Sequence, residues 1–169
     1  MNTSRIGPAP RWAVVASGIL VILGVAAASY LTYSHYSAST LAACPNTGLI
    51  NCQKVTSSAQ SKILGIPVAV LGLAYFISAI AFYNPIAWRS PRRWVHIVRL
   101  VMAVSAMCFV LWLVYAELII IGNICEYCTG VHVITFALFV VTLVAVPPML
   151  ASPDEFEDET DDQSLDAPH

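Results

Sequence analysis

Charged side chains are scarce in this chain of 169 residues: they make up 11% of it, whereas soluble domains carry about 25%. Hydrophobic residues account for 58%, and the mean hydropathy is +0.74. Acidic residues are almost missing from the body of the chain, which holds only Glu117 and Glu126, because the other eight lie between Asp154 and Asp166. This composition excludes an ordinary soluble domain. The basic residues also form no pattern typical of nucleic-acid binding.

Four apolar stretches are long enough to cross a hydrocarbon core of about 30 Å, which takes about 20 residues in a helix. They cover residues 12–33, 63–83, 100–121 and 127–150. The first has the basic flank of a secretory signal, but it is longer than the apolar region of such signals, so we expect it to be retained. The sequence therefore predicts an all-α polytopic membrane protein, a bundle of four transmembrane helices over residues 12–151, with a long loop between the first two.

The arginines predict how the bundle is oriented, because basic residues that flank spans mark the cytoplasmic side. Six arginines lie in the N-terminal segment and between the second and third spans, whereas the other side holds only Lys54 and Lys62. We therefore predict a cell-membrane protein with a cytoplasmic N-terminus at residues 1–11 and a disordered, acidic cytoplasmic tail at residues 152–169. The 34–62 loop and the turn before the fourth span then face outward.

Four cysteines lie in these outward segments, as the pairs Cys44/Cys52 and Cys125/Cys128. Turn residues between Cys44 and Cys52 bring these two within reach of a disulfide. Cys125 and Cys128 form a Cys-x-x-Cys motif that opens the fourth span, where the helix N-terminus stabilises a thiolate. Three interpretations follow: structural disulfides, a zinc site with four cysteine ligands, or a thiol relay between the pairs. An oxidising compartment disfavours zinc, and we predict no metal.

These features together resemble the vitamin K epoxide reductase family, and in particular its bacterial members. The resemblance covers almost the whole chain from Trp12 to Leu150, and it depends on two cysteine pairs, four spans and matching sidedness. The residues that carry it are Cys44, Cys52, Ser57-Ser58, Gly65-Ile66-Pro67 and Cys125-Glu126-Tyr127-Cys128. Many bacterial relatives carry a fused thioredoxin-like domain, whereas this chain has an acidic tail in that place.

The resemblance implies a membrane oxidoreductase that passes electrons to a quinone of the menaquinone or ubiquinone type. Cys125 and Cys128 match the active-site pair beside the quinone. Cys44 and Cys52 match the loop pair that exchanges disulfides with an extracytoplasmic thioredoxin-like (DsbA-like) thiol oxidase, which we expect to act in trans. Such a protein supports disulfide formation in exported proteins. The alternatives are an epoxide reductase with the same cysteines and a non-enzymatic membrane scaffold held by disulfides.

Two further residues are assigned to the quinone site. Ser58 matches a serine that the family places near its redox centre, with Ser57 as the alternative in register. His132 lies one helical turn beyond Cys128 and takes the place of a tyrosine of the animal enzymes. Those enzymes also use an asparagine at the start of the second span, and residues 57–72 contain none. Both departures favour plain quinone reduction over epoxide reduction.

Two smaller expectations concern residues outside the cysteine pairs, and one acidic residue is left without a role. Residues 53–60 contain no helix breaker and are expected to form a short surface helix. Cys108 lies in the middle of the third span and is expected to be a small buried hydrophobic residue. Glu117, near the outer end of the same span, has no role that its position in the sequence assigns.

Overall fold

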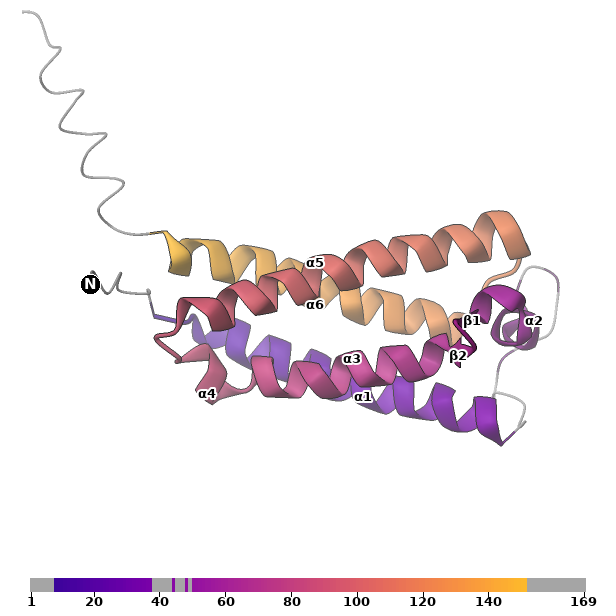
Figure 1. Ribbon diagram of the computed structural model, residues 1–169, viewed down its shortest axis with the longest axis horizontal. Helices are drawn as coiled ribbons and strands as arrows, with labels where there is room; N and C mark the ends of the chain where they lie inside the picture. The colour runs from indigo at the N-terminus through magenta and orange to yellow at the C-terminus, as the bar shows by residue number, and fades with distance from the viewer. Residues whose placement is uncertain (1–7, 38–43, 45–47, 49, 152–169) are drawn as a thin grey trace, which may run out of the picture.

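The computed structural model describes residues 8–37, 44, 48 and 50–151, so the predictions for the N-terminal segment, the acidic tail and the turn at 45–47 lie outside the described residues. The described chain is mostly helical (Figure 1). Its long helices are α1 (Arg11–Tyr36), α3 (Val68–Tyr83), α5 (Arg93–Tyr115) and α6 (Glu126–Leu150). The shorter elements are α2 (Cys52–Ser57), the 3₁₀ turn η1 (Ala59–Ser61), β1 (Lys62–Ile63), β2 (Ile66–Pro67), α4 (Pro85–Trp88) and the π-helix η2 (Ala116–Ile121).

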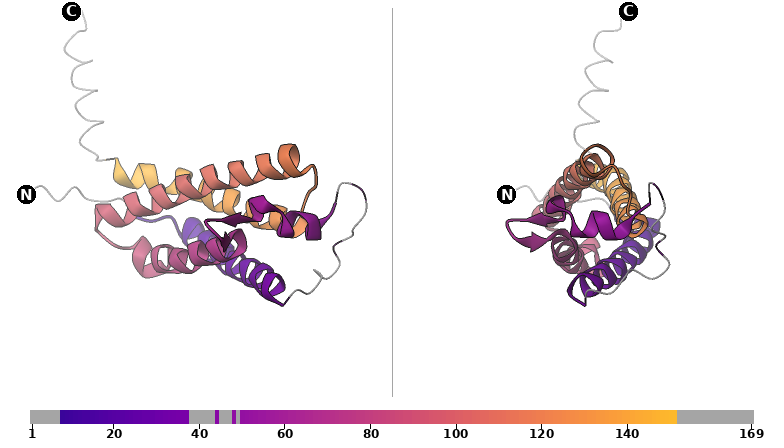
Figure 2. Two further views of the ribbon diagram at one scale, coloured as in Figure 1. Left: turned by 45° about the vertical axis from the view of Figure 1, so that its right-hand side comes forward. Right: turned by 90° about the vertical axis from the view of Figure 1, so that its right-hand side faces the viewer.

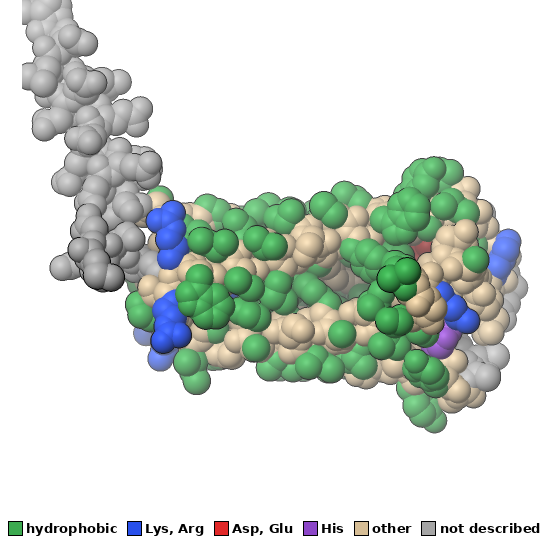
Figure 3. Space-filling view, viewed as in Figure 1, with side chains coloured by type: hydrophobic (Ala, Val, Ile, Leu, Met, Phe, Trp, Pro, Cys, Tyr) green, Lys and Arg blue, Asp and Glu red, His purple; other side chains and the backbone are tan. Residues whose placement is uncertain are grey.

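The four long helices lie side by side and form one bundle (Figure 2). Helix α1 packs against α3 and α6, and α5 packs against α6. Helix α2 and the β1–β2 hairpin lie at one end of the bundle, whereas α4 and the start of α1 lie at the other (Figure 1). Three helical segments are long and apolar enough to cross a membrane: α1, α5 together with η2, and α6. Apolar side chains cover the flanks of the bundle, and basic side chains gather at its ends (Figure 3).

The second predicted span begins later than expected. Its first residues form the antiparallel hairpin of β1 and β2, in which Lys62 pairs with Pro67 and Ile63 with Ile66. Leu64 and Gly65 form the turn with φ values of 52° and 83°, a left-handed conformation that glycine tolerates best. Helix α3 therefore has only 16 residues, about 24 Å of helix, which is less than a typical hydrocarbon core. The hairpin brings this part of the chain to the end of the bundle that holds the cysteines.

A buried arginine fixes the opposite end of α3. The side chain of Arg99 is fully buried, and its Nε and Nη2 donate hydrogen bonds to the carbonyl oxygen of Phe82 at 3.1 and 2.6 Å. Its Nη1 lies 2.9 Å from Nδ1 of His96, and its guanidinium stacks 3.9 Å from the ring centroid of Trp88. Arg99 therefore holds the last turn of α3 against α4 and α5.

Helix α1 packs tightly against α3 at Gly24. A Cβ added at this position would overlap the ring of Phe76, which is 1% exposed. A side chain on α1 here would force the two helices apart.

We therefore expect Gly24→Ala to destabilise the bundle by about 1–3 kcal/mol, the usual cost of overpacking a core. Gly18→Ala is the matched control, because a Cβ at Gly18 meets nothing within 4 Å. It should leave stability unchanged or raise it slightly, since alanine is the better helix former. Unfolding in detergent measures both variants, and equal stabilities would contradict this account of the α1–α3 contact.

Candidate redox site

Cys44 and Cys52 form a disulfide with a Cα–Cα distance of 6.3 Å, so the predicted proximity of the loop pair is confirmed. Cys52 is the first residue of α2, which ends at Ser57, so the short helix expected over residues 53–60 is confirmed for its first part and gives way to the 3₁₀ turn η1. The side chain of Asn51 caps α2 by accepting a hydrogen bond from the backbone N–H of Lys54 at 2.9 Å. This disulfide also removes two of the four thiolates that a zinc site would need, and among the described residues no group of three or more candidate ligands comes together.

Cys125 and Cys128 lie at the N-terminus of α6, as the motif predicts. Cys125 is the N-cap residue, and its Sγ accepts a hydrogen bond from the backbone N–H of Cys128 at 3.3 Å. The thiol of Cys128 also donates to Sγ of Cys125 at 2.7 Å. These contacts hold the pKa of the Cys125 thiol below its usual value, with the hydrogen bond from the Cys128 thiol as the largest cause. Cys125 is therefore the sulfur that carries negative charge most readily in the reduced pair.

Backbone contacts join the loop pair to the Cys-x-x-Cys motif. Ile50 and Ile124 form a parallel bridge, and the N–H of Asn51 donates to the carbonyl of Ile124 at 3.1 Å. The side-chain amide of Asn123 donates to the carbonyl of Gly48 at 3.1 Å. These bonds fix the start of α2 beside the start of α6, although the two segments are about 70 residues apart in the chain.

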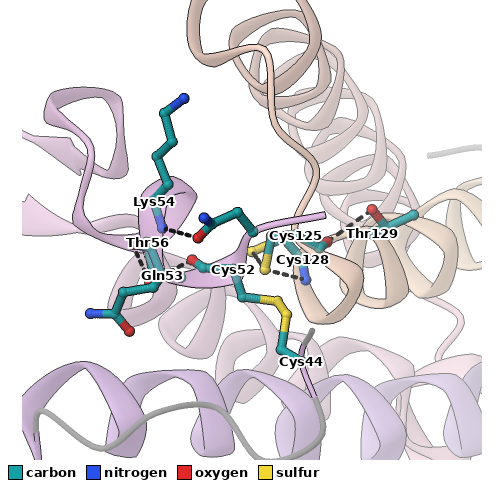
Figure 4. The surroundings of a disulfide bond; sticks show 9 residues. Cys44, Cys52, Gln53, Lys54, Thr56, Cys125, Cys128 and Thr129 are labelled. Carbon is teal, nitrogen blue, oxygen red and sulfur yellow. Dashed lines mark hydrogen bonds between the residues drawn. A yellow bond between two sulfur atoms is a disulfide. The ribbon is translucent and has the colours of Figure 1, made fainter. Parts of the chain in front are cut away.

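The two cysteine pairs consequently share one buried cluster. Cys52 and Cys125 are 1% and 0% exposed, and they pack together with Leu31 and Val55. Cys44 and Cys128 lie against the same cluster. In Figure 4 the disulfide stands directly beside the sulfurs of Cys125 and Cys128, with Cys52 nearer to them than Cys44. Exchange between the pairs therefore needs no large movement of either helix.

A cavity of about 580 Å³ opens beside this cluster, between α1, α3, α5 and α6. Cys128 lines the cavity, whereas Cys44, Cys52 and Cys125 do not. His132 lines it too and is 8% exposed. The rest of the wall is mainly apolar and includes Tyr75, Phe76, Phe109, Val110 and Leu113.

Ser58 and Ser57, the two alternative matches to the family's serine, both line the cavity. The hydroxyl of Ser58 donates to the carbonyl of Val55 at 2.8 Å, and that of Ser57 donates to the carbonyl of Gln53 at 2.7 Å. Ser57 is exposed, whereas Ser58 is half-buried. Each hydroxyl is thus already used as a donor to the backbone and remains able to accept a hydrogen bond.

Two expectations about α5 and its extension change. Cys108 is exposed on the outer face of α5, so the prediction of a buried residue is wrong. Glu117, which the sequence left without a role, is 7% exposed and lines the cavity. An isolated acid inside an apolar run is the sequence signal that points to such a residue, because a charge there is costly.

The fold and the site define a helical membrane protein whose two cysteine pairs meet beside an apolar cavity. A family model described as the vitamin K epoxide reductase family matches residues 15–143, which is most of the chain. The chain belongs to the vitamin K epoxide reductase family. Membership makes it a membrane oxidoreductase, and it confirms the resemblance drawn from the cysteine spacing.

Proposed function

We propose that this protein re-oxidises an extracytoplasmic thioredoxin-like partner and passes the electrons through its two cysteine pairs to a membrane quinone. One observation carries the proposal: Cys52 and Cys125 are packed in one buried cluster, and of the four cysteines only Cys128 lines the cavity. The loop pair is thus placed to exchange with the second pair, and the second pair is placed to meet a ligand in the cavity.

The relay consists of thiolate attacks on disulfide sulfurs. A partner thiolate attacks Cys44, the Cys44–Cys52 bond breaks, and Cys52 leaves as a thiolate. Cys52 then attacks Cys125 in the oxidised Cys125–Cys128 pair, and Cys128 leaves as a thiolate on the cavity side. The second partner thiolate next frees Cys44, which re-forms its bond with Cys52 and releases Cys125. Two electrons have then moved from the partner to Cys125 and Cys128.

The chemistry of the cavity fits a quinone. Its volume of about 580 Å³ lies within the usual range for small-molecule sites, and its wall is mainly apolar with a few polar groups. A bound quinone supplies an acceptor for two electrons and two protons. Cys128, which lines the cavity, would deliver the electrons, the imidazole of His132 would hydrogen-bond a carbonyl oxygen, and the hydroxyl of Ser58 would add a second polar contact. The apolar side chains of α3 and α5 that line the cavity would exclude water from a bound quinone.

The membrane arrangement is part of the proposal. Four crossings, with the short α3 as the second, put both termini in the cytoplasm and both cysteine pairs outside. The arginines of the α4–α5 region support this orientation, since Arg89, Arg92 and Arg93 are exposed at the end of the bundle opposite the cysteines. The partner then reaches Cys44 from the oxidising side.

Replacing His132 by phenylalanine is expected to raise the KM for quinone about tenfold, because a hydrogen bond in a buried site contributes about 1.4 kcal/mol. His132→Gln, which keeps an amide donor, should recover part of the affinity. Steady-state kinetics with a soluble quinone analogue measure both variants. An unchanged KM in His132→Phe would remove this residue from the quinone site.

The overall function is tested by supplying the purified protein with a reduced thioredoxin-like protein and, in separate reactions, a quinone or its epoxide. We expect the quinone to be reduced with oxidation of two partner thiols for each quinone consumed. Faster consumption of the epoxide would make the protein an epoxide reductase. Consumption of neither would favour a scaffold held by disulfides.

A further inference from the structure

Glu117 is the only acidic residue that lines the cavity in the described chain, and it is almost fully buried. Figure 3 shows acidic atoms recessed between neighbouring side chains at the end of the bundle that holds the cysteines. A carboxyl group in an apolar wall is costly to maintain, and such groups in membrane proteins are typical of functional sites. The position of Glu117 therefore indicates a role in the chemistry of the site.

Glu117 lies in a local distortion of the backbone beside the cavity. Residues Ala116–Ile121 form a π-helix, which is rare and occurs frequently at functional sites. Gly122 ends it with a φ of 66°, and the N–H of Asn123 donates to the backbone carbonyl of Glu117 at 3.2 Å. The chain thus turns back at once, which brings the Glu117 carboxyl group close to the backbone N–H of Cys125.

Glu117 and the cysteine pair consequently compete for the same electrostatic stabilisation. The N-terminus of α6 carries a positive partial charge, and both the Glu117 carboxylate and the Cys125 sulfur lie against it. Two negative charges this close in an apolar environment repel each other strongly, so a proton on one favours a charge on the other.

We propose that Glu117 is the proton acceptor and donor of the Cys125/Cys128 pair, an assignment that rests on the proposed function. When the S–S bond forms, two electrons leave to the quinone and the S–H proton of Cys128 moves to the Glu117 carboxylate. Glu117 then gives this proton to a quinone oxygen, and the second proton comes from water at the outer mouth of the cavity. Glu117 is then a carboxylate and takes up a new proton from water at the outer mouth of the cavity. When Cys52 next breaks the S–S bond, Glu117 gives this proton to the departing Cys128 thiolate.

The other titratable groups that face this cavity belong to four elements: His35 of α1, Lys62 of β1, Tyr75 of α3, and Cys128 and His132 of α6. Lys62 and His35 lie toward the end of the bundle that holds the cysteines, and Lys62 contributes positive charge there. Glu117 is the single carboxylate in this set. Removing the Glu117 carboxylate therefore takes away negative charge beside the thiols, and no other group that faces the cavity can replace it.

The test compares Glu117→Gln with Glu126→Gln, which removes an exposed acid from the first turn of α6. The first readout is the alkylation rate of Cys125 in the reduced protein without quinone, followed by mass spectrometry across about pH 5 to 9. Loss of the neighbouring carboxylate should lower the pKa of Cys125, so alkylation below neutral pH should speed up severalfold in Glu117→Gln. The second readout, quinone reduction, should fall about a hundredfold, as for loss of a general acid–base group.

Glu117→Asp keeps the charge and should retain the wild-type alkylation profile with reduced turnover, so it decides the matter if Glu117→Gln does not fold. The inference is overturned if Glu117→Gln matches Glu126→Gln in both readouts, or if Glu117→Asp alkylates as Glu117→Gln is expected to do. Cys128→Ser separates this failure from a failure of the proposed function. If that variant still reduces quinone, the function itself is wrong. If it does not, only the role of Glu117 is lost.

Discussion

A chain carrying Cys128→Ser is expected to lose quinone reduction by about a thousandfold or more, because it removes a sulfur that takes part in bond formation. Cys128 is the cavity-lining member of the pair, and a hydroxyl in its place cannot form the disulfide with Cys125. The loop disulfide is unaffected by this change. The variant should therefore still exchange disulfides with a reduced thioredoxin-like protein at Cys44, although it completes no catalytic cycle.

Cys108→Ser is the matched control for this experiment. Cys108 is also a free thiol within the bundle, but it is exposed on the outer face of α5 and does not line the cavity. Its replacement should leave turnover at the wild-type rate. If Cys128→Ser keeps more than a small fraction of wild-type turnover, the electrons reach the quinone by another route and the assignment of Cys128 is wrong.

The second large effect is expected from Cys52→Ala, which should accumulate a mixed disulfide between the partner and the protein. Cys44 and Cys52 form the loop disulfide, and in the proposed relay the partner attacks Cys44. Without Cys52, no loop thiol remains that can attack the disulfide between Cys44 and the partner and release the partner. Non-reducing electrophoresis, followed by peptide mass spectrometry, should find most of the trapped partner on Cys44.

Cys44→Ala provides the opposite result. It leaves Cys52, which is 1% exposed, as the only loop cysteine, and a buried sulfur is a poor target for an external protein. This variant should trap little partner. Equal trapping by the two variants would show that the loop cysteines are not distinguished by exposure, and trapping by neither would remove the partner from the proposal.

Much of this arrangement follows from the sequence because membrane insertion imposes strict length and polarity limits. The apolar runs at 12–33, 100–121 and 127–150 correspond to α1, to α5 with η2, and to α6. The cysteine spacing correctly predicts that the Cys-x-x-Cys motif opens a helix. The start of α3 is missed because the hairpin residues are themselves apolar, so composition does not separate them from the helix that follows.

The inner and outer faces of the helices are harder to predict. In a membrane both the lipid-facing and the bundle-facing sides of a helix are apolar, so hydrophobic periodicity carries little information about which side is which. This explains the wrong prediction of a buried Cys108. The same reasoning applies to Arg99, which counts in the sequence as a flanking charge, whereas the structure shows it fully buried within the α3–α4–α5 corner.

The placement of Glu117 depends on backbone geometry that the sequence does not signal. Nothing in Ala116–Ile121 distinguishes a π-helix from the ordinary helix that precedes it, because both need the same apolar residues. The turn of the α5–α6 connection depends on Gly122, whose left-handed conformation is compatible with many loops. Only the fold brings the carboxylate to the N-terminus of α6.

Electron transfer from Cys52 to Cys125 is the central step of this account, and its most direct test is a chain that keeps only these two cysteines. After mild oxidation and denaturation, peptide mass spectrometry should find Cys52 and Cys125 joined in most molecules, since they share one buried cluster. A chain that keeps only Cys44 and Cys128 should be joined in few. A Cys44–Cys128 bond that forms as readily as the Cys52–Cys125 bond, or the absence of the latter, would contradict the relay.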